Sequence, residues 1–211
     1  MQEISFELIK GLPKVELHCH LDGSLRINTI IDIAKQKKVQ LPTYNPNELF
    51  KLISLDKQKV SLEDYIDRFD LTLSVLQDDD SLERVSYELI EDLAKDNIYY
   101  AEIRFSPILH TKKEMTIDDA LNAVKKGLNK GEKEYGIKSG IIICGIRSMD
   151  PSVSIDLAEL AVKYKNNGVI GFDLAGAEYN YPAKKHKEAF YLIRNNNINT
   201  TIHAGEAFGP E

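Results

Sequence analysis

The segment VELHCHLDGS, Val15–Ser24, decides the fold class. It predicts a β-strand over Val15–His20 that passes directly into loop residues. Further strands are predicted where short apolar runs also end in loop residues, and several of these runs are nearly continuous, as in parallel sheets covered on both faces. These further strands are Tyr99–Phe105, Gly140–Ile146, Val169–Leu174 and Thr200–His203.

Amphipathic helices are predicted between the strands. The long sequence between the first and second strands, about 41–76, is also expected to be helical. Ser24 precedes the first predicted helix, whose apolar face is Ile27, Ile30, Ile31 and Ala34. The others are predicted to start at Asp80 with Glu83 as a capping box (ending near Lys95), at Thr116 (ending near Tyr135), near Pro151 (running towards Asn167, with Gly168 as its stop) and at about Ala183 (ending near Asn196).

Alternating strands and helices are typical of βαβ units with a parallel sheet. Such a chain forms either a closed (β/α)8 TIM barrel or an open doubly wound sheet. The open nucleotide-binding sheet carries a glycine-rich first turn, whereas here the first strand ends in HCHLDGS and no GxGxxG or GxxxxGK[ST] occurs. We therefore expect a barrel with about the first five β/α units present, and residues 1–211 as the N-terminal part of one domain.

Composition excludes several classes of protein. With 27 Lys+Arg against 33 Asp+Glu the net charge is −6, which argues against a nucleic-acid binder. Apolar runs such as Gly140–Ile146 are too short to cross a membrane, and the N-terminus has no signal-peptide pattern. The only cysteines, Cys19 and Cys144, cannot form a disulfide framework. We expect a soluble cytoplasmic protein without a membrane partner.

Histidines at two strand ends suggest a metal site. His18 and His20 share one face of a strand, while Cys19 points away. His203 ends the last predicted strand and could complete a set of three for Zn²⁺, with Glu206 above it as a general acid/base. The alternatives remain open: two histidines at this spacing are more often surface or core residues, and HAGE could be a strand end with a helix-capping acid.

Other residues have weaker signals. In DLAGAE, Asp173–Glu178, Gly176 would let the backbone approach a flat ligand, or would simply serve a turn. His110 could line the mouth of a barrel, although a solvated loop position is favoured, and His186 is expected at the surface.

Structural positions are expected for the remaining polar and sulfur-containing candidates. Glu102 with Arg104 is expected as a structural ion pair, with an interior polar pair that supports the site as the alternative. Asp78–Asp80 is expected as a solvated helix entry and Cys144 as a small buried residue.

Four motifs together resemble the adenosine deaminase family, which belongs to the metal-dependent amidohydrolases. They occur in the family's order and span the chain: LPKVELHCHLDGSLR (Leu12–Arg26), RFSPILH (Arg104–His110), GFDLAGAE (Gly171–Glu178) and TIHAGEAFGPE (Thr201–Glu211). The resemblance implies one Zn²⁺ per chain, held by His18, His20 and His203, with Glu206 donating a proton to N1 of the purine. The reaction implied is hydrolysis of adenosine, and of 2′-deoxyadenosine, to the inosine product and ammonia in purine salvage.

The resemblance also implies the contacts of the substrate. Asp22 would bind the 5′-hydroxyl of the ribose, Gly176 would contact the purine, and His20 would line the same substrate site. Relatives that act on free adenine resemble HLEG where this chain has HLDG, so Asp22 favours the nucleoside. A deaminase of adenine or of a modified purine remains the alternative enzyme.

The family pattern includes a histidine after the sixth strand and an Asp pair after the eighth, and neither is among these residues. We therefore expect a fragment with an incomplete catalytic apparatus and little activity. Its open barrel edges would favour self-association. The alternative from another class is a non-catalytic binding or assembly module.

Overall fold

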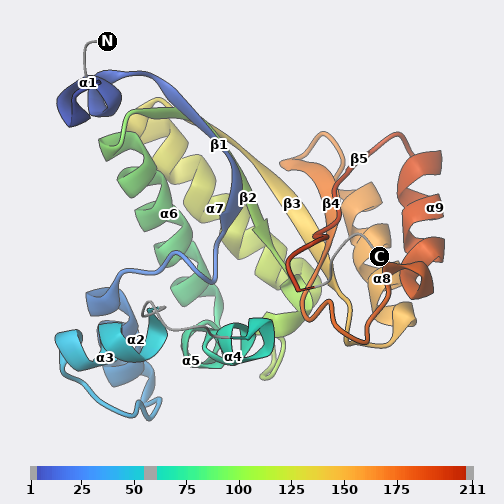
Figure 1. The fold of residues 1–211 in the computed structure, drawn as a ribbon, viewed down its shortest axis with the longest axis horizontal. Helices are drawn as coiled ribbons and strands as arrows, with labels where there is room; N and C mark the ends of the chain where they lie inside the picture. The colour runs from blue at the N-terminus through green and yellow to red at the C-terminus, as the bar shows by residue number, and fades with distance from the viewer. Residues whose placement is uncertain (1–3, 55–60, 208–211) are drawn as a thin grey trace.

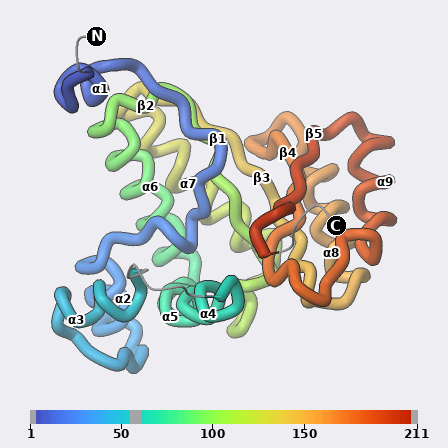
Figure 2. Tube along the Cα trace, viewed as in Figure 1, coloured from blue at the N-terminus to red at the C-terminus, as the bar shows by residue number. Residues whose placement is uncertain are grey.

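A parallel sheet forms the centre of the computed structural model, which describes residues 4–54 and 61–207. Its strands are hydrogen-bonded in chain order, and every neighbouring pair is parallel. Figures 1 and 2 show β1 and β5 at opposite edges of this sheet. The strands are β1 Lys14–His20, β2 Ile98–Phe105, β3 Lys138–Ile146, β4 Val169–Ala175 and β5 Asn199–Thr200.

The five predicted strands are confirmed, with one difference in length. The strand expected over Thr200–His203 is regular only over Asn199–Thr200. Its backbone nevertheless stays beside β4, because Thr201 N–H donates to the Phe172 carbonyl and His203 N–H to the Leu174 carbonyl. The chain therefore reaches His203 in an extended conformation with few sheet hydrogen bonds.

Helices α6 to α9 lie along one face of the sheet, and α2 to α5 lie beyond the carboxyl ends of the strands (Figure 1). The helices are α1 Phe6–Gly11, α2 Ile27–Lys37, α3 Pro46–Ile53, α4 Leu62–Asp67, α5 Phe69–Ser74, α6 Asp79–Lys95, α7 Ile117–Tyr135, α8 Pro151–Lys163 and α9 Lys187–Asn195, with 3-10 turns η1 Pro107–His110 and η2 Ala183–His186. The helical prediction for 41–76 is confirmed by α3, α4 and α5, although 41–45 form a loop, and 55–60 lie outside the described residues.

Side-chain caps explain which helix starts were predicted correctly. Helix α7 follows Thr116, as expected, and Thr116 forms a capping box there with Asp119. Ser24 precedes α2, as expected, but it does not cap the helix: α2 begins at Ile27, and the Ser24 hydroxyl donates to the His20 carbonyl instead. The capping box at Asp80 is wrong, because Asp78 accepts from Ser81 N–H and caps α6.

Two helix ends differ from expectation for local reasons. Helix α8 stops at Lys163, before the predicted end at Asn167, and Gly168 with its φ of +97° serves the turn into β4. The last helix starts as the 3-10 turn η2 before it becomes α9. Both differences leave the order of elements unchanged.

The sheet is strongly curved. If it were flat, β1 and β5 would lie about 19 Å apart, since neighbouring strands are separated by about 4.8 Å. Two imidazole side chains cannot bridge such a gap, yet Nε2 of His18 on β1 lies 2.9 Å from Nε2 of His203 after β5. This curvature is that of part of a TIM barrel, and it brings the carboxyl ends of the edge strands together.

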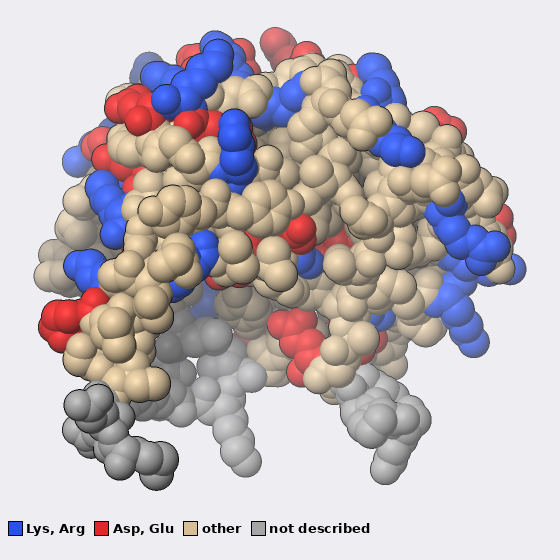
Figure 3. Space-filling model, turned by 90° about the horizontal axis from the view of Figure 1, so that it is seen from above, with Lys and Arg blue, Asp and Glu red and all other residues tan. Residues whose placement is uncertain are grey.

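The surface carries mixed charge. Figure 3 shows one face of the molecule, on which basic and acidic side chains are interspersed around a largely uncharged middle. Among the described helices, none has the length and apolarity required to cross a bilayer.

Candidate metal and substrate site

A cavity of about 700 Å³ opens at the carboxyl ends of the strands. This is the end at which (β/α)8 barrels carry their active sites. Side chains of α4 and α5 form an apolar wall on one side, and the ends of β1, β4 and β5 supply the polar groups. Its lining includes His18, His20, Asp22, Leu62, Tyr65, Ile66, Phe69, Leu73, Gly176, His203 and Glu206.

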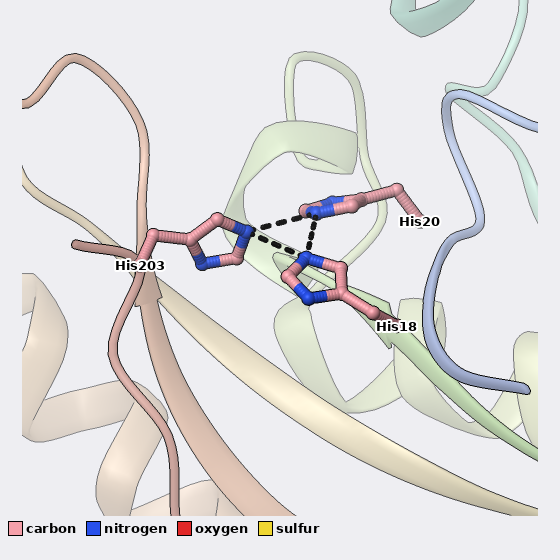
Figure 4. A group of neighbouring side chains, drawn as sticks. All are labelled: His18, His20 and His203. Atoms are coloured by element: carbon pink, nitrogen blue, oxygen red, sulfur yellow. Dashed lines mark hydrogen bonds between the residues drawn. The ribbon is translucent and has the colours of Figure 1, made fainter. Parts of the chain in front are cut away.

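Three histidines converge in this cavity. His18 and His20 project from β1 to the same side, and His203 faces them from the segment after β5 (Figure 4). The three Nε2 atoms form a triangle with edges of 3.3 Å between His18 and His20, 2.9 Å between His18 and His203, and 3.1 Å between His20 and His203. Cys19, as the strand alternation predicts, takes no part, and its Sγ lies 3.5 Å from the Ser24 hydroxyl.

This triangle fits a tetrahedral metal ion. Ligand nitrogens about 2.05 Å from Zn²⁺ are about 3.3 Å from one another in ideal tetrahedral geometry. Burial first, and then the neighbouring His203 and His18, lower the pKa of His20 to about 4. Burial also lowers the pKa of His18, with help from Arg104. A neutral imidazole keeps a lone pair for a cation, so the lowered pKa values of His18 and His20 suit these two rings to a zinc-type ion.

A buried carboxylate stands behind His203. The Nδ1 atom of His203 lies 2.8 Å from Oδ2 of Asp173, which is fully buried on β4 and also accepts from Arg104 at 2.9 Å. Burial opposes ionisation of Asp173, but the hydrogen bond from His203 and the charges of His203 and Arg104 outweigh it and hold its pKa well below the usual range. The 2.8 Å approach of this carboxylate to Nδ1 orients the His203 ring so that its Nε2 faces the cavity.

Glu206 lies on a loop held by another carboxylate. Gly205, Glu206 and Ala207 each donate a backbone N–H to Glu178, all at 2.9 Å. Gly205 has a φ of +80°, which a glycine adopts without strain. The loop after β5 is thus tied to the loop after β4, with Glu206 facing the cavity.

Asp22 and Gly176 line the cavity as well. Asp22 is buried, burial raises its pKa to about 6, and its Oδ1 has no hydrogen-bond partner among the described residues. Gly176 has a φ of +94°, and a Cβ there would lie 3.3 Å from Ile146 Cγ2. A buried acceptor without a partner at a cavity wall can bind a hydroxyl of a ligand.

Two histidine predictions are wrong. His110 is neither at the mouth nor solvated: it is buried, its Nδ1 donates to the Leu76 carbonyl, and burial lowers its pKa to about 4. His186 is not at the surface: it is the last residue of η2 and lies buried against Ser154 and the Arg147 carbonyl. Both rings sit in 3-10 turns, whose inward positions helical periodicity does not predict.

The predicted ion pair between Glu102 and Arg104 is also absent from the described structure. Arg104 pairs with Asp173 across the sheet, and Glu102 accepts from the Tyr100 hydroxyl at 3.1 Å. Asp78–Asp80 does form the entry of α6, and Cys144 is buried, as expected.

Sequence reasoning missed the residues that support the site. Asp173, Glu178 and Arg147 were given no role, and neither were the apolar residues of α4 and α5. One signal was available for Asp173: an acidic residue inside the apolar strand GFDLA is costly to bury without a partner.

Comparison with known proteins identifies the family. The family model for adenosine deaminase matches residues 13–211. The chain belongs to the adenosine deaminase family. Among curated relatives, a probable adenosine deaminase of Dictyostelium discoideum is 48% identical over 97% of this chain and 27% of its own length. The adenosine deaminase of Clostridium acetobutylicum is 44% identical over 95% of this chain and 60% of its own length. The chain thus spans less than two thirds of these relatives.

Solved structures share the fold of this family member. An amidohydrolase of Burkholderia ambifaria with bound zinc has a TM-score of 0.86 at 24% identity, over 97% of this chain and 56% of its own. The N6-mAMP deaminase of Arabidopsis has a TM-score of 0.83 at 26% identity, over 97% of this chain and 62% of its own. The chain therefore has the fold of part of an amidohydrolase TIM barrel.

Proposed function

We propose that this chain is part of a zinc-dependent adenosine deaminase, with residues 1–211 lying in one barrel domain. The observation that carries the proposal is the triangle of Nε2 atoms from His18, His20 and His203, with edges of 2.9 to 3.3 Å. It lies in a cavity that Glu206 also lines. The curated adenosine deaminases of Dictyostelium and Clostridium support adenosine as the substrate.

The proposed reaction replaces the 6-amino group by oxygen. Zinc held by the three histidines would supply a water of lowered pKa, a nucleophile at neutral pH. As the C6–O bond forms, Glu206 gives a proton to N1, so the ring accepts the electron pair. The C6–N bond then breaks: the amino group takes one proton of the attacking water and leaves as ammonia, and the other proton of that water restores Glu206. Adenosine plus water becomes inosine plus ammonia, and 2′-deoxyadenosine would react in the same way, consistent with a role in purine salvage in the cytoplasm.

The substrate would be held by residues on two sides of the cavity. The unpartnered Oδ1 of Asp22 would accept from the 5′-hydroxyl of the sugar. The backbone at Gly176, where a side chain would crowd Ile146, would lie against the purine. His20 would lie beside the reacting carbon, and the apolar wall of α4 and α5 would exclude water.

The experiment is to load the chain with zinc and to follow the conversion of adenosine by absorbance, at a wavelength where adenosine and inosine absorb differently. The aspartate pair and the further histidine that the family resemblance implies are not among these residues, so we expect zinc binding but slow turnover. Glu206→Gln should remove about 10²- to 10⁴-fold of whatever activity is present and leave the zinc content unchanged. Glu188→Gln, an exposed glutamate on α9, is the matched control.

Adenine and N6-methyladenosine 5′-monophosphate test the alternative substrates. Faster turnover of either would contradict the assignment to adenosine. Asp22→Glu should shift the preference from adenosine towards adenine. A chain that binds zinc, forms a defined dimer and deaminates none of these compounds would support a non-catalytic module instead.

A further inference from the structure

The backbone that carries His203 has little support from the sheet. Strand β5 pairs with β4 only through Gly171 with Asn199 and Phe172 with Thr200. Beyond this pairing, two backbone N–H groups still donate to β4. On its other side this segment is the edge of the sheet, and no strand among the described residues donates hydrogen bonds to it there. A metal ligand here needs another support if its Nε2 is to stay within bonding distance of a shared ion.

Arg147 supplies that support from the end of β3. Its side chain is buried, and its guanidinium donates one N–H to the carbonyl of His203 and another, at 3.2 Å, to the carbonyl of Tyr181. Its own N–H donates to the Ala175 carbonyl at the end of β4. One planar side chain thus joins the segment after β5 to the loop between β4 and η2. This contact reaches His203 from the backbone side, whereas Asp173 holds the ring.

His186 in turn holds Arg147. Its Nε2 lies 3.2 Å from the Arg147 carbonyl, and its Nδ1 lies 2.8 Å from the Ser154 hydroxyl on α8. A carbonyl only accepts, so Nε2 must donate to it, and in the neutral ring Nδ1 then accepts from Ser154. His186 and Ser154 are both buried. A continuous polar chain therefore runs Ser154, His186, Arg147, His203.

We propose that Arg147 is a positioning residue for the third zinc ligand, with His186 and Ser154 anchoring it to α8. The proposal rests on the proposed zinc site, and it assigns a purpose to a buried arginine and a buried histidine that touch neither metal nor substrate. Partners in the outer shell of a metal site commonly change metal affinity by 10- to 100-fold when removed. Arg147 acts on the backbone, so its loss would move the ring of His203 without changing its chemistry.

The test measures zinc affinity of the purified chain by competition with a coloured chelator. Arg147→Met removes both donors at similar side-chain length, and we expect about 10- to 100-fold weaker zinc binding. Arg147→Lys keeps the charge but cannot reach two carbonyls with a planar fork, so an intermediate loss is expected. Arg84→Met removes an arginine that joins α6 to α2 through Asp32, away from the site, and should leave zinc affinity unchanged.

Cobalt absorption separates positioning from general destabilisation. With Co²⁺ in place of zinc, Arg147→Met should show altered visible absorption bands, because the geometry of the ligands changes. The control Arg84→Met should show the same bands as the parent, even if it is less stable to unfolding. If the Met variant does not fold, the Lys variant decides. His186→Gln should weaken zinc binding and alter the cobalt bands as Arg147→Met does, but to a smaller extent.

Two different failures can be told apart. If the parent chain binds zinc and the folded Arg147 variant binds it equally tightly with the same cobalt spectrum, the positioning role is refuted and the proposed function stands. If the parent chain binds no zinc, the proposed function fails, and the positioning role fails with it.

Discussion

At the residue scale, the site depends on buried charges that neutralise one another. Arg104 and Asp173 form an ion pair in the core, and Asp173 is shared with the Nδ1 of His203. Removing one member of a buried pair leaves the other charge uncompensated, which is more costly than the pair itself is favourable. The same carboxylate therefore supports both folding and the orientation of His203, the proposed metal ligand.

Asp173→Asn should separate these two effects. The amide keeps the shape of the carboxylate but not its charge, so Arg104 remains buried without an anion. We expect the free energy of unfolding to fall by about 3 to 5 kcal/mol and zinc binding to weaken about 10- to 100-fold. Chemical denaturation and chelator competition measure the two quantities. Unchanged zinc affinity in the folded variant would show that His203 does not need this partner.

His110 gives the chain a pH dependence that does not involve the proposed metal site. Its folded pKa is about 4, below the ordinary value of 6.5, because burial disfavours the charged ring. The unfolded chain therefore binds more protons as pH falls from 6.5 towards 4, and stability is lost over that range. At pH 7.5 we expect His110→Gln to be less stable to unfolding than the parent. By pH 4.5 the parent should have lost the stability that depends on a neutral His110, so most of the difference between the two proteins should be gone. Parallel stability curves for parent and variant would contradict this.

At the element scale, the loops after the strands hold the functional groups. Glu178, after β4, accepts three N–H groups of the loop after β5 and so sets the path of the chain at Glu206. Hydrogen bonds to a charged acceptor are stronger than neutral ones. A local network of this kind joins two loops that the sheet itself does not pair.

Glu178→Gln should loosen this loop without unfolding the chain. The neutral amide accepts with one oxygen only, so we expect amide hydrogen exchange of Gly205, Glu206 and Ala207 to be about 10-fold faster or more. Exchange in β3 should not change, and Glu188→Gln serves as the control. If the three amides exchange at parental rates, the carboxylate does not order the loop.

Elements show what the sequence could predict and what it could not. The apolar runs of β2, β3 and β4 and the capping residues of α7 are local signals, so these elements were found. The spacing of His18 and His20 predicted a shared face for the same reason. Arg147, His186 and Glu178 were missed because their partners lie 27 to 56 residues away in the sequence, and only the tertiary fold brings them together. Thus the three histidines of the site could be predicted from the sequence, but the residues that position them could not.

At the scale of the whole molecule, the sheet has two edges among the described residues. On β1, Val15 and Leu17 are 62% and 53% exposed, on the edge opposite β5. An apolar edge strand with free backbone groups pairs readily with another chain. The curvature that joins His18 to His203 therefore coexists with an exposed apolar edge.

Leu17→Lys should reduce self-association of the chain. A lysine on an edge strand disfavours pairing with a second copy, because its charge would have to be buried. Light scattering over a range of concentrations measures the mean mass. We expect concentration-dependent association of the parent and less of it in the variant, with zinc binding retained. A parent that stays monomeric at high concentration would contradict the expectation.

X-ray absorption at the zinc edge of the zinc-loaded chain is the most direct test of the three-histidine site. The account predicts a stoichiometry of one zinc per chain and a first shell containing three imidazole nitrogens at about 2.0 to 2.1 Å, with the outer-shell scattering of histidine rings. His203→Ala should reduce the imidazole count to two. A spectrum with fewer imidazoles in the parent chain, or one that His203→Ala leaves unchanged, would contradict the account.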